Sequence, residues 1–202
     1  MVCYNKNMNK EKVREFFNAM ADSWDQGMVI NEAVIKTILD NVAVREGIDV
    51  LDVASGTGVL IPFYLSRNVR SVTAIDVSER MSAIAAQKFS TNGQVRVICA
   101  DVLGYLPDRL YDVIVVYNAL PHFPDDEQLI SALSAMLEEG GRLTIAHGMS
   151  RERINDHHRN VSPEIRKPLK PVEELAEIMA RHLQVEITVS TDSMYQIVGR
   201  KL

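Results

Sequence analysis

Residues 50–60 read VLDVASGTGVL, a short apolar run that ends in a loop of small residues containing Gly56 and Gly58. An apolar run of this length, bounded by a turn signal, is typical of a strand buried on both faces. Glycine in the following loop permits positive φ angles and lets a ligand approach the backbone closely. The stretch therefore predicts the first strand of a parallel sheet, with a ligand loop at its carboxyl end.

Further short apolar runs alternate with helical patterns along the chain. The runs predict strands at 72–75, 95–99, 111–117 and 142–147, and the patterns between them predict helices at 59–65, 78–88 (with Ser78 as N-cap) and 126–137. This alternation indicates βαβ units and a sheet covered by helices on both faces. After a helix at 172–182, runs at 185–189 and 194–198 flank a short turn and predict an antiparallel hairpin. We expect an α/β fold with a doubly wound, mostly parallel sheet of seven strands whose last strand is antiparallel.

We expect one domain over residues 1–202, elaborated by a helical cap. Amphipathic patterns at 11–27 and around 34–39 predict two helices upstream of the first strand. Residues 149–170 are polar, rich in His and Arg, and have no clear period. The expected parts are cap helices (1–44), a cofactor-binding core (45–148), a cap or substrate segment (149–170) and a closing helix with a hairpin (171–202).

Composition narrows the class of protein. The chain has 202 residues, of which 47% are hydrophobic and 24% charged, and its net charge is −5. These are ordinary globular values, and a protein that coats nucleic acid would normally be strongly basic. No apolar run approaches the roughly 20 residues that span a bilayer. We expect a cytoplasmic protein without a nucleic-acid or membrane partner.

The two cysteines, Cys3 and Cys99, lack metal or redox spacing. The sequence does not indicate the oligomeric state.

Two carboxylates follow the next strands. Asp76 ends the second predicted strand and Asp101 ends the third. Ligands of open α/β sheets bind at the carboxyl ends of strands, where a carboxylate can accept hydrogen bonds from ribose hydroxyls or from an exocyclic amine such as that of adenine. Asp and Gly are also common turn residues. However, the glycine loop, Asp76 and Asp101 each follow a predicted strand at its carboxyl end, and together they favour a pocket for an adenine nucleoside.

Over residues 45–148 the chain resembles the class I S-adenosylmethionine-dependent methyltransferases. VLDVASGTGVL resembles their motif I, AIDVSERM the ribose-binding segment, and ADVLGYLP the adenine-contacting segment. YDVIVVYNALPHF resembles motif IV, and EEGGRLTIAHG resembles the junction before the fifth strand. One departure is Ala54-Ser55, which stands where Gly-Cys or Gly-Gly is commoner. Small residues remain, so we expect the turn to be kept.

The resemblance implies a set of cofactor contacts. Asp52 would orient the loop and lie near the methionine amino group, Gly56 and Gly58 would face the methionine and the ribose, and Asp76 and Asp101 would hold ribose and adenine. The remaining expected contacts are Ala54, Val77, Met81, Val102 and Asn118. FFNAMADSWDQ resembles the cap helix of small-molecule methyltransferases, so Phe16 and Trp24 are candidates for the pocket wall. They also fit the core face of an amphipathic helix.

Methyl transfer from a sulfonium needs alignment and exclusion of water more than a catalytic side chain. A general base is needed only if the acceptor loses a proton, and His122 and His147 are the candidates for that base or for positioning the acceptor. The expected acceptor contacts are Tyr117, His122, His147, Arg151 and His158. A structural role remains open for each histidine. We expect no metal, since His147, His157 and His158 lack a ligand spacing.

We therefore expect methyl transfer from S-adenosylmethionine to a small-molecule acceptor. A methyltransferase acting on RNA or protein is one alternative, and a non-catalytic sensor or scaffold that binds the cofactor or a metal is another. An NAD dehydrogenase would need a third glycine at position 61, where the chain has Ile61.

Overall fold

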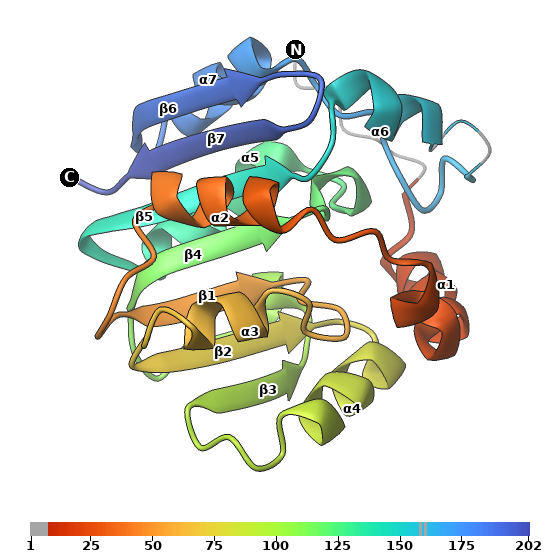
Figure 1. The fold of residues 1–202 in the computed structure, drawn as a ribbon. Helices are drawn as coiled ribbons and strands as arrows, with labels where there is room; N and C mark the ends of the chain where they lie inside the picture. The colour runs from red at the N-terminus through yellow and green to blue at the C-terminus, as the bar shows by residue number, and fades with distance from the viewer. Residues whose placement is uncertain (1–7, 158, 160) are drawn as a thin grey trace.

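Residues 8–157, 159 and 161–202 are described by the structure, a computed structural model. In this part of the chain, seven strands form one sheet in the order β3-β2-β1-β4-β5-β7-β6 (Figure 1). The strands are β1 (Asp49–Val53), β2 (Ser71–Asp76), β3 (Val95–Cys99), β4 (Tyr111–Tyr117), β5 (Leu137–His147), β6 (Gln184–Ser190) and β7 (Tyr195–Arg200). β7 runs antiparallel to both β5 and β6, and the other pairings are parallel. The predicted fold class is confirmed, with the antiparallel last strand inserted between β5 and β6.

Helices cover both faces of the sheet because the central strands are apolar on both. Val50 of β1 packs in a core with α2 (Glu32–Asn41) and α3 (Ile61–Leu65), whereas Leu51 packs in a second core with α5 (Asp126–Ala135) and α7 (Val172–Met179). In Figure 1, α2 and α3 lie in front of the sheet. α4 (Glu79–Lys88) lies beside β2 and β3 and is capped by Ser78 as predicted, whose hydroxyl accepts from the Met81 amide.

The N-terminal cap lies beyond the carboxyl ends of the parallel strands (Figure 1). A single helix was predicted over 11–27, but the α-helix α1 (Lys10–Met20) ends earlier, and Ala21–Gly27 forms a 3₁₀ helix, η1. Residues 22–27 read DSWDQG, and Asp, Ser and Gly are weak α-helix formers, which explains the change.

Other predictions of helix and strand bounds were wrong, and one helix was missed. The helix predicted at 126–137 ends at Ala135, and β5 begins at Leu137, so Gly140 and Gly141 lie inside the strand at an irregularity of its pairing with β4. Gly140 has a φ of 76°, a conformation that suits glycine at a bulge. A helix that the sequence did not predict, α6 (Arg151–His157), buries only Ile154 and thus shows no hydrophobic period. The helix predicted at 172–182 ends at Met179.

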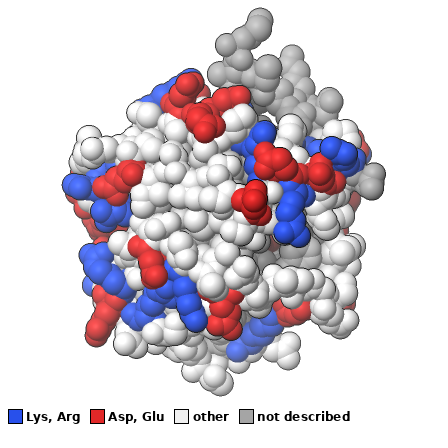
Figure 2. Space-filling view, turned by 45° about the horizontal axis from the view of Figure 1, so that its top comes forward, with Lys and Arg blue, Asp and Glu red and all other residues white. Residues whose placement is uncertain are grey.

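Two surface properties bear on partners. None of the described helices is long and apolar enough to cross a membrane. Figure 2 shows acidic and basic side chains interspersed over the face in view, without one extended basic patch.

Candidate functional site

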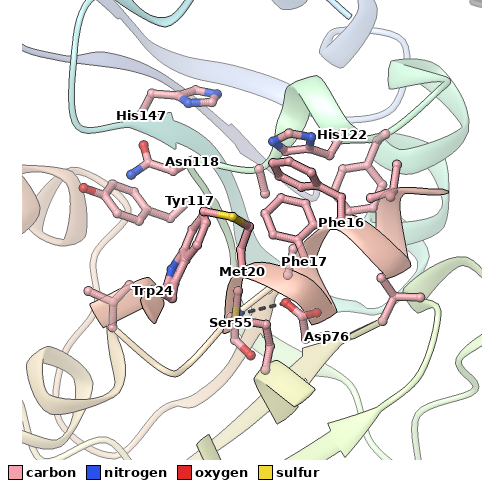
Figure 3. Close-up of a pocket in the computed structure, with 18 of the residues that line it drawn as sticks. Phe16, Phe17, Met20, Trp24, Ser55, Asp76, Tyr117, Asn118, His122 and His147 are labelled. Carbon is pink, nitrogen blue, oxygen red and sulfur yellow. Dashed lines mark hydrogen bonds between the residues drawn. The ribbon is translucent and has the colours of Figure 1, made fainter. Parts of the chain in front are cut away.

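A cavity of about 540 Å³ opens at the carboxyl ends of the parallel strands. Its wall comes from the loops after β1, β2, β3, β4 and β5, from α1 and η1, and from α6. Figure 3 shows Asp76 on one side and His122 and His147 on the other, with Trp24, Met20 and Phe17 between them. The cavity therefore joins residues expected to contact a cofactor with residues expected to contact an acceptor.

The loop after β1 has the backbone of a ligand cradle. Ala54 and Gly56 have φ angles of 53° and 56°, so the turn is kept with alanine at its first position. A side-chain carbon at Gly56 would meet only the Trp24 Nε1, at 3.8 Å, so the backbone there faces open space below the indole. Gly58, with a φ of 86°, is instead packed: a side-chain carbon would lie 2.7 Å from Phe89.

Asp76 is fixed at the end of β2. Its Oδ2 accepts a hydrogen bond from the Gly56 amide, and its Oδ1 accepts one from the Ser78 amide, each at 2.8 Å. Burial raises the pKa of this carboxyl, and the two amide hydrogen bonds limit the rise. The carboxylate thus lies in the cavity wall with its orientation set by backbone.

Asp101 caps the short 3₁₀ helix η2 (Val102–Gly104) after β3. Its Oδ1 accepts from the Leu103 amide at 3.0 Å, and its Oδ2 pairs with the Lys10 ammonium at 2.6 Å. The ion pair joins the first residue of α1 to the end of the cavity expected to hold a base. Sequence reasoning did not identify Lys10, because nothing local relates it to a residue 91 positions away.

Asp52 lies behind the glycine loop and is not among the described residues that line the cavity. Its side chain is 2% exposed, and burial raises its pKa to about 8; the neighbouring Tyr64 hydroxyl opposes this rise, and the charge of Asp76 adds to it. Its Oδ2 completes no hydrogen bond within the described residues. This buried polar oxygen can hold the loop or meet a cationic group placed over it.

His122 has a defined tautomer. It ends the 3₁₀ helix η3 (Leu120–His122), and its Nδ1 lies 3.0 Å from the Ile165 carbonyl oxygen. Because a carbonyl oxygen only accepts, Nδ1 carries the proton and Nε2 carries the lone pair. Burial lowers the pKa of the ring, so it is neutral at pH 7. The ring of Phe17 packs edge-on against it, with centroids 4.9 Å apart.

Tyr117, Asn118 and His147 complete this end of the cavity. Asn118 has a φ of 54°, which asparagine tolerates, and its Oδ1 accepts from the Gly148 amide at 3.0 Å. The contact ties the loop after β4 to the end of β5. His147 is buried and packs edge-on against Tyr195. Burial raises the pKa of Tyr117.

The cap is attached to the glycine loop by polar contacts. Asp25 accepts from the Thr57 hydroxyl at 2.6 Å and pairs with Lys88 at 2.5 Å, and Asn18 accepts from the Ser78 hydroxyl at 2.6 Å. The apolar face of α1, including Phe16, Phe17 and Met20, therefore faces the cavity. The helical period revealed that face but could not distinguish a cavity wall from a core.

Most of the expected site residues come together. Those that line the cavity are Trp24, Ala54, Gly56, Asp76, Val77, Met81, Asp101, Val102, Tyr117, Asn118, His122 and His147. Asp52, Gly58 and Arg151 do not line it; Arg151 pairs with Glu152 at the start of α6. His158 lies outside the described residues. Within the described residues, no group of three or more His, Cys, Asp and Glu side chains is placed to hold a metal ion.

Comparison with known proteins gives a consistent result. The family model of the methyltransferase domain matches residues 50–141. A ubiquinone biosynthesis O-methyltransferase of Coxiella burnetii (strain RSA 331 / Henzerling II) is 28% identical over 155 residues, which cover 71% of this chain and 64% of the relative. The chain thus spans somewhat less than two thirds of the length of that curated relative.

Solved structures share the fold. The N-methyltransferase NodS of Bradyrhizobium japonicum WM9, in complex with S-adenosylhomocysteine, superposes with a TM-score of 0.73 and 17% identity, covering 96% of this chain and 98% of NodS. The magnesium protoporphyrin IX methyltransferase of Synechocystis PCC 6803, with bound S-adenosylhomocysteine, gives 0.72 and 17%, covering 96% and 99%. The resemblance to class I methyltransferases is confirmed.

Proposed function

We propose that this chain transfers a methyl group from S-adenosylmethionine to a small-molecule acceptor, because residues 50–141 match the family model of the methyltransferase domain. One observation carries the proposal: a single cavity joins a glycine loop and two strand-end carboxylates to a neutral histidine with a fixed tautomer. This arrangement suits a nucleoside at one end and a reacting group at the other.

The chain's residues fit the cofactor. Asp76 would accept from the ribose hydroxyls, because its oxygens are held by two amides and still face the cavity. Asp101 would accept from the adenine amine while Lys10 holds its other side. Gly56 leaves open backbone for the methionine part. The Oδ2 of Asp52 completes no hydrogen bond within the described residues, and a cationic amino group bound over the loop would lower the raised pKa of this carboxyl and favour its ionised form.

When bound, S-adenosylmethionine supplies a methyl carbon and a sulfonium sulfur that keeps the electron pair of the broken bond. Trp24, Phe17 and Met20 cover the cavity and exclude water from it, and the face of Trp24 can stabilise a cation. We propose that His122 Nε2 accepts the proton that a hydroxyl or ammonium acceptor loses. Its proton-bearing Nδ1 remains bound to the Ile165 carbonyl, so the base keeps its orientation.

We also propose that different segments of the chain bind the cofactor and the acceptor. Residues 45–148 would bind the cofactor, while Tyr117, His147 and the segment 149–170, including Arg151 and His158, would shape the acceptor site. The names of two similar proteins support this choice, since one is a ubiquinone biosynthesis O-methyltransferase and the other a magnesium protoporphyrin IX methyltransferase.

Calorimetric titration of the purified chain with S-adenosylmethionine, S-adenosylhomocysteine and NAD tests the proposal. We expect micromolar binding of the first two and none of NAD, followed by release of S-adenosylhomocysteine when an acceptor is supplied. A folded, cofactor-free sample that binds neither would refute the proposal. Binding without turnover across a broad set of small molecules and macromolecules would instead indicate a non-catalytic binding protein.

A further inference from the structure

The walls of the cavity at the histidine end are largely apolar. Phe16 and Phe17 of α1 lie on one side, and Phe123, Met149 and Ile154 come from the segments after β4 and β5. An acceptor in this space would exchange water for hydrocarbon over most of its surface. Apolar lining with a few convergent polar groups is typical of a site for a molecule with a small polar head and an apolar body.

The apolar lining continues out of the cavity onto the surface. Met20, Val29 and Ile30 line the cavity, yet they are 40%, 94% and 49% exposed. The other exposed large hydrophobic side chains of the described residues, Leu106, Leu110 and Leu202, do not line it. Single exposed hydrophobic residues are normal, but a group of them at the mouth of a site marks a binding surface.

The charges near this rim argue for a free molecule. The three acids of residues 21–32 each pair with one base, Asp22 with Arg80, Asp25 with Lys88 and Glu32 with Lys36, so these pairs leave no basic excess. A docking surface for an anionic membrane would instead carry basic residues beside the exposed hydrophobic ones. The rim formed by Met20, Val29 and Ile30 is therefore better suited to the apolar part of an uncharged amphiphile.

Building on the proposed function, we propose that the acceptor is an amphiphile: its polar head carries the methylated atom near His122, and its apolar chain leaves the cavity across Met20, Val29 and Ile30. Each methylene that lies on this path leaves water. Burial of one methylene contributes roughly 0.8 kcal/mol, or about fourfold in affinity, so two contribute about 15-fold.

The native Trp24 provides the measurement, because it is the only tryptophan of the chain and lines the cavity. We would titrate 1-butanol, 1-hexanol and 1-octanol into the protein saturated with S-adenosylhomocysteine and follow its fluorescence. We expect the dissociation constant to fall by about 15-fold for each added pair of methylenes. An affinity that does not depend on chain length would overturn the inference.

Two variants locate the effect. Val29→Asp with Ile30→Asp should abolish most of the gain between hexanol and octanol, whereas Leu202→Asp, at an exposed side chain that does not line the cavity, should keep it. Equal effects of both variants would contradict the placement of the alkyl chain on this rim. The placement would also be wrong if the double variant left alkanol binding unchanged and altered only self-association, measured by light scattering, or only binding to phosphatidylcholine vesicles.

A calorimetric titration of each protein with S-adenosylhomocysteine separates this inference from the proposed function. If the unsubstituted chain does not bind S-adenosylhomocysteine, the proposed function fails. If it binds S-adenosylhomocysteine but shows no dependence on alkanol length, only the amphiphile is wrong.

Discussion

The buried carboxyl of Asp52 should make the chain less stable as the pH rises, and Asp52→Asn should remove that dependence. The side chain is 2% exposed, and its pKa is raised by burial to about 8 from an ordinary 3.8. Between these two values the folded chain holds a proton that the unfolded chain has lost. Since the folded state binds more protons, its free energy of unfolding falls with increasing pH.

The magnitude follows from the two pKa values. The penalty is absent below the unfolded pKa, grows by about 1.36 kcal/mol per pH unit above it, and is complete above the folded pKa. From pH 5 to pH 7 this amounts to about 3 kcal/mol. Asparagine has nearly the same shape and does not titrate. The difference in stability between Asp52→Asn and the parent should therefore increase by about 3 kcal/mol over that range.

Urea denaturation followed by circular dichroism at pH 5, 6 and 7 measures this difference, with equal m-values as the condition for comparing the curves. Asp49→Asn is the matched control. Burial raises the pKa of Asp49, but hydrogen bonds from Arg70 and Ser71 outweigh it, so its pKa is lowered. Asp49 is thus ionised in both states above pH 5, and its variant should run parallel to the parent, at lower stability.

A constant difference between Asp52→Asn and the parent, within about 0.5 kcal/mol from pH 5 to pH 7, would refute the reasoning. Such a result would mean that Asp52 is already ionised in the folded chain. Its charge would then be balanced by a group that is not among its described neighbours.

Three further substitutions test other parts of the molecule. Asp76→Ala should weaken the binding of S-adenosylhomocysteine by about 1–3 kcal/mol in calorimetry, and unchanged affinity would remove this carboxylate from the site. Gly58→Ala should lower the free energy of unfolding by about 2–4 kcal/mol in urea, because the new carbon meets Phe89 and the positive φ is retained. Asp126→Ala should cost about 3–5 kcal/mol in the same assay, since it leaves the buried Lys167 ammonium without its partner; a loss below 1 kcal/mol would show that the pair is solvated.

The fold was largely predictable because its signals are local. Each parallel strand is a short apolar run, and the turn residues after it mark its carboxyl end. Once these ends are known, the geometry of a parallel sheet brings Gly56, Asp76 and Asp101 to one edge. The structure places all three in the cavity wall. The exact bounds were less predictable. Gly140 can indicate the end of a helix, but a helix end and a β-bulge both favour a glycine with positive φ, and Gly140 lies at a bulge.

Contacts between distant segments were not predictable from local patterns. Nothing in the sequence near Lys10 relates it to Asp101, and α6 buries too few apolar side chains to show a period. The contact of Asp52 with the cofactor is expected from its place in the motif and stays a prediction. Alternation along β1 places its side chain beside Tyr64, on the same face of the sheet as Val50.

The two ends of the cavity therefore depend on the sequence in different ways. The end with Asp76 is built by turns whose residues fix their own geometry, so a motif suffices to recognise it. At the other end, the tautomer of His122 is fixed by Ile165, which is 43 residues away, and the apolar wall comes from α1. These segments carry helical or irregular patterns that many cores share. A cofactor can thus be inferred from short stretches of such a chain, whereas the acceptor is defined only once the cap has folded over the sheet.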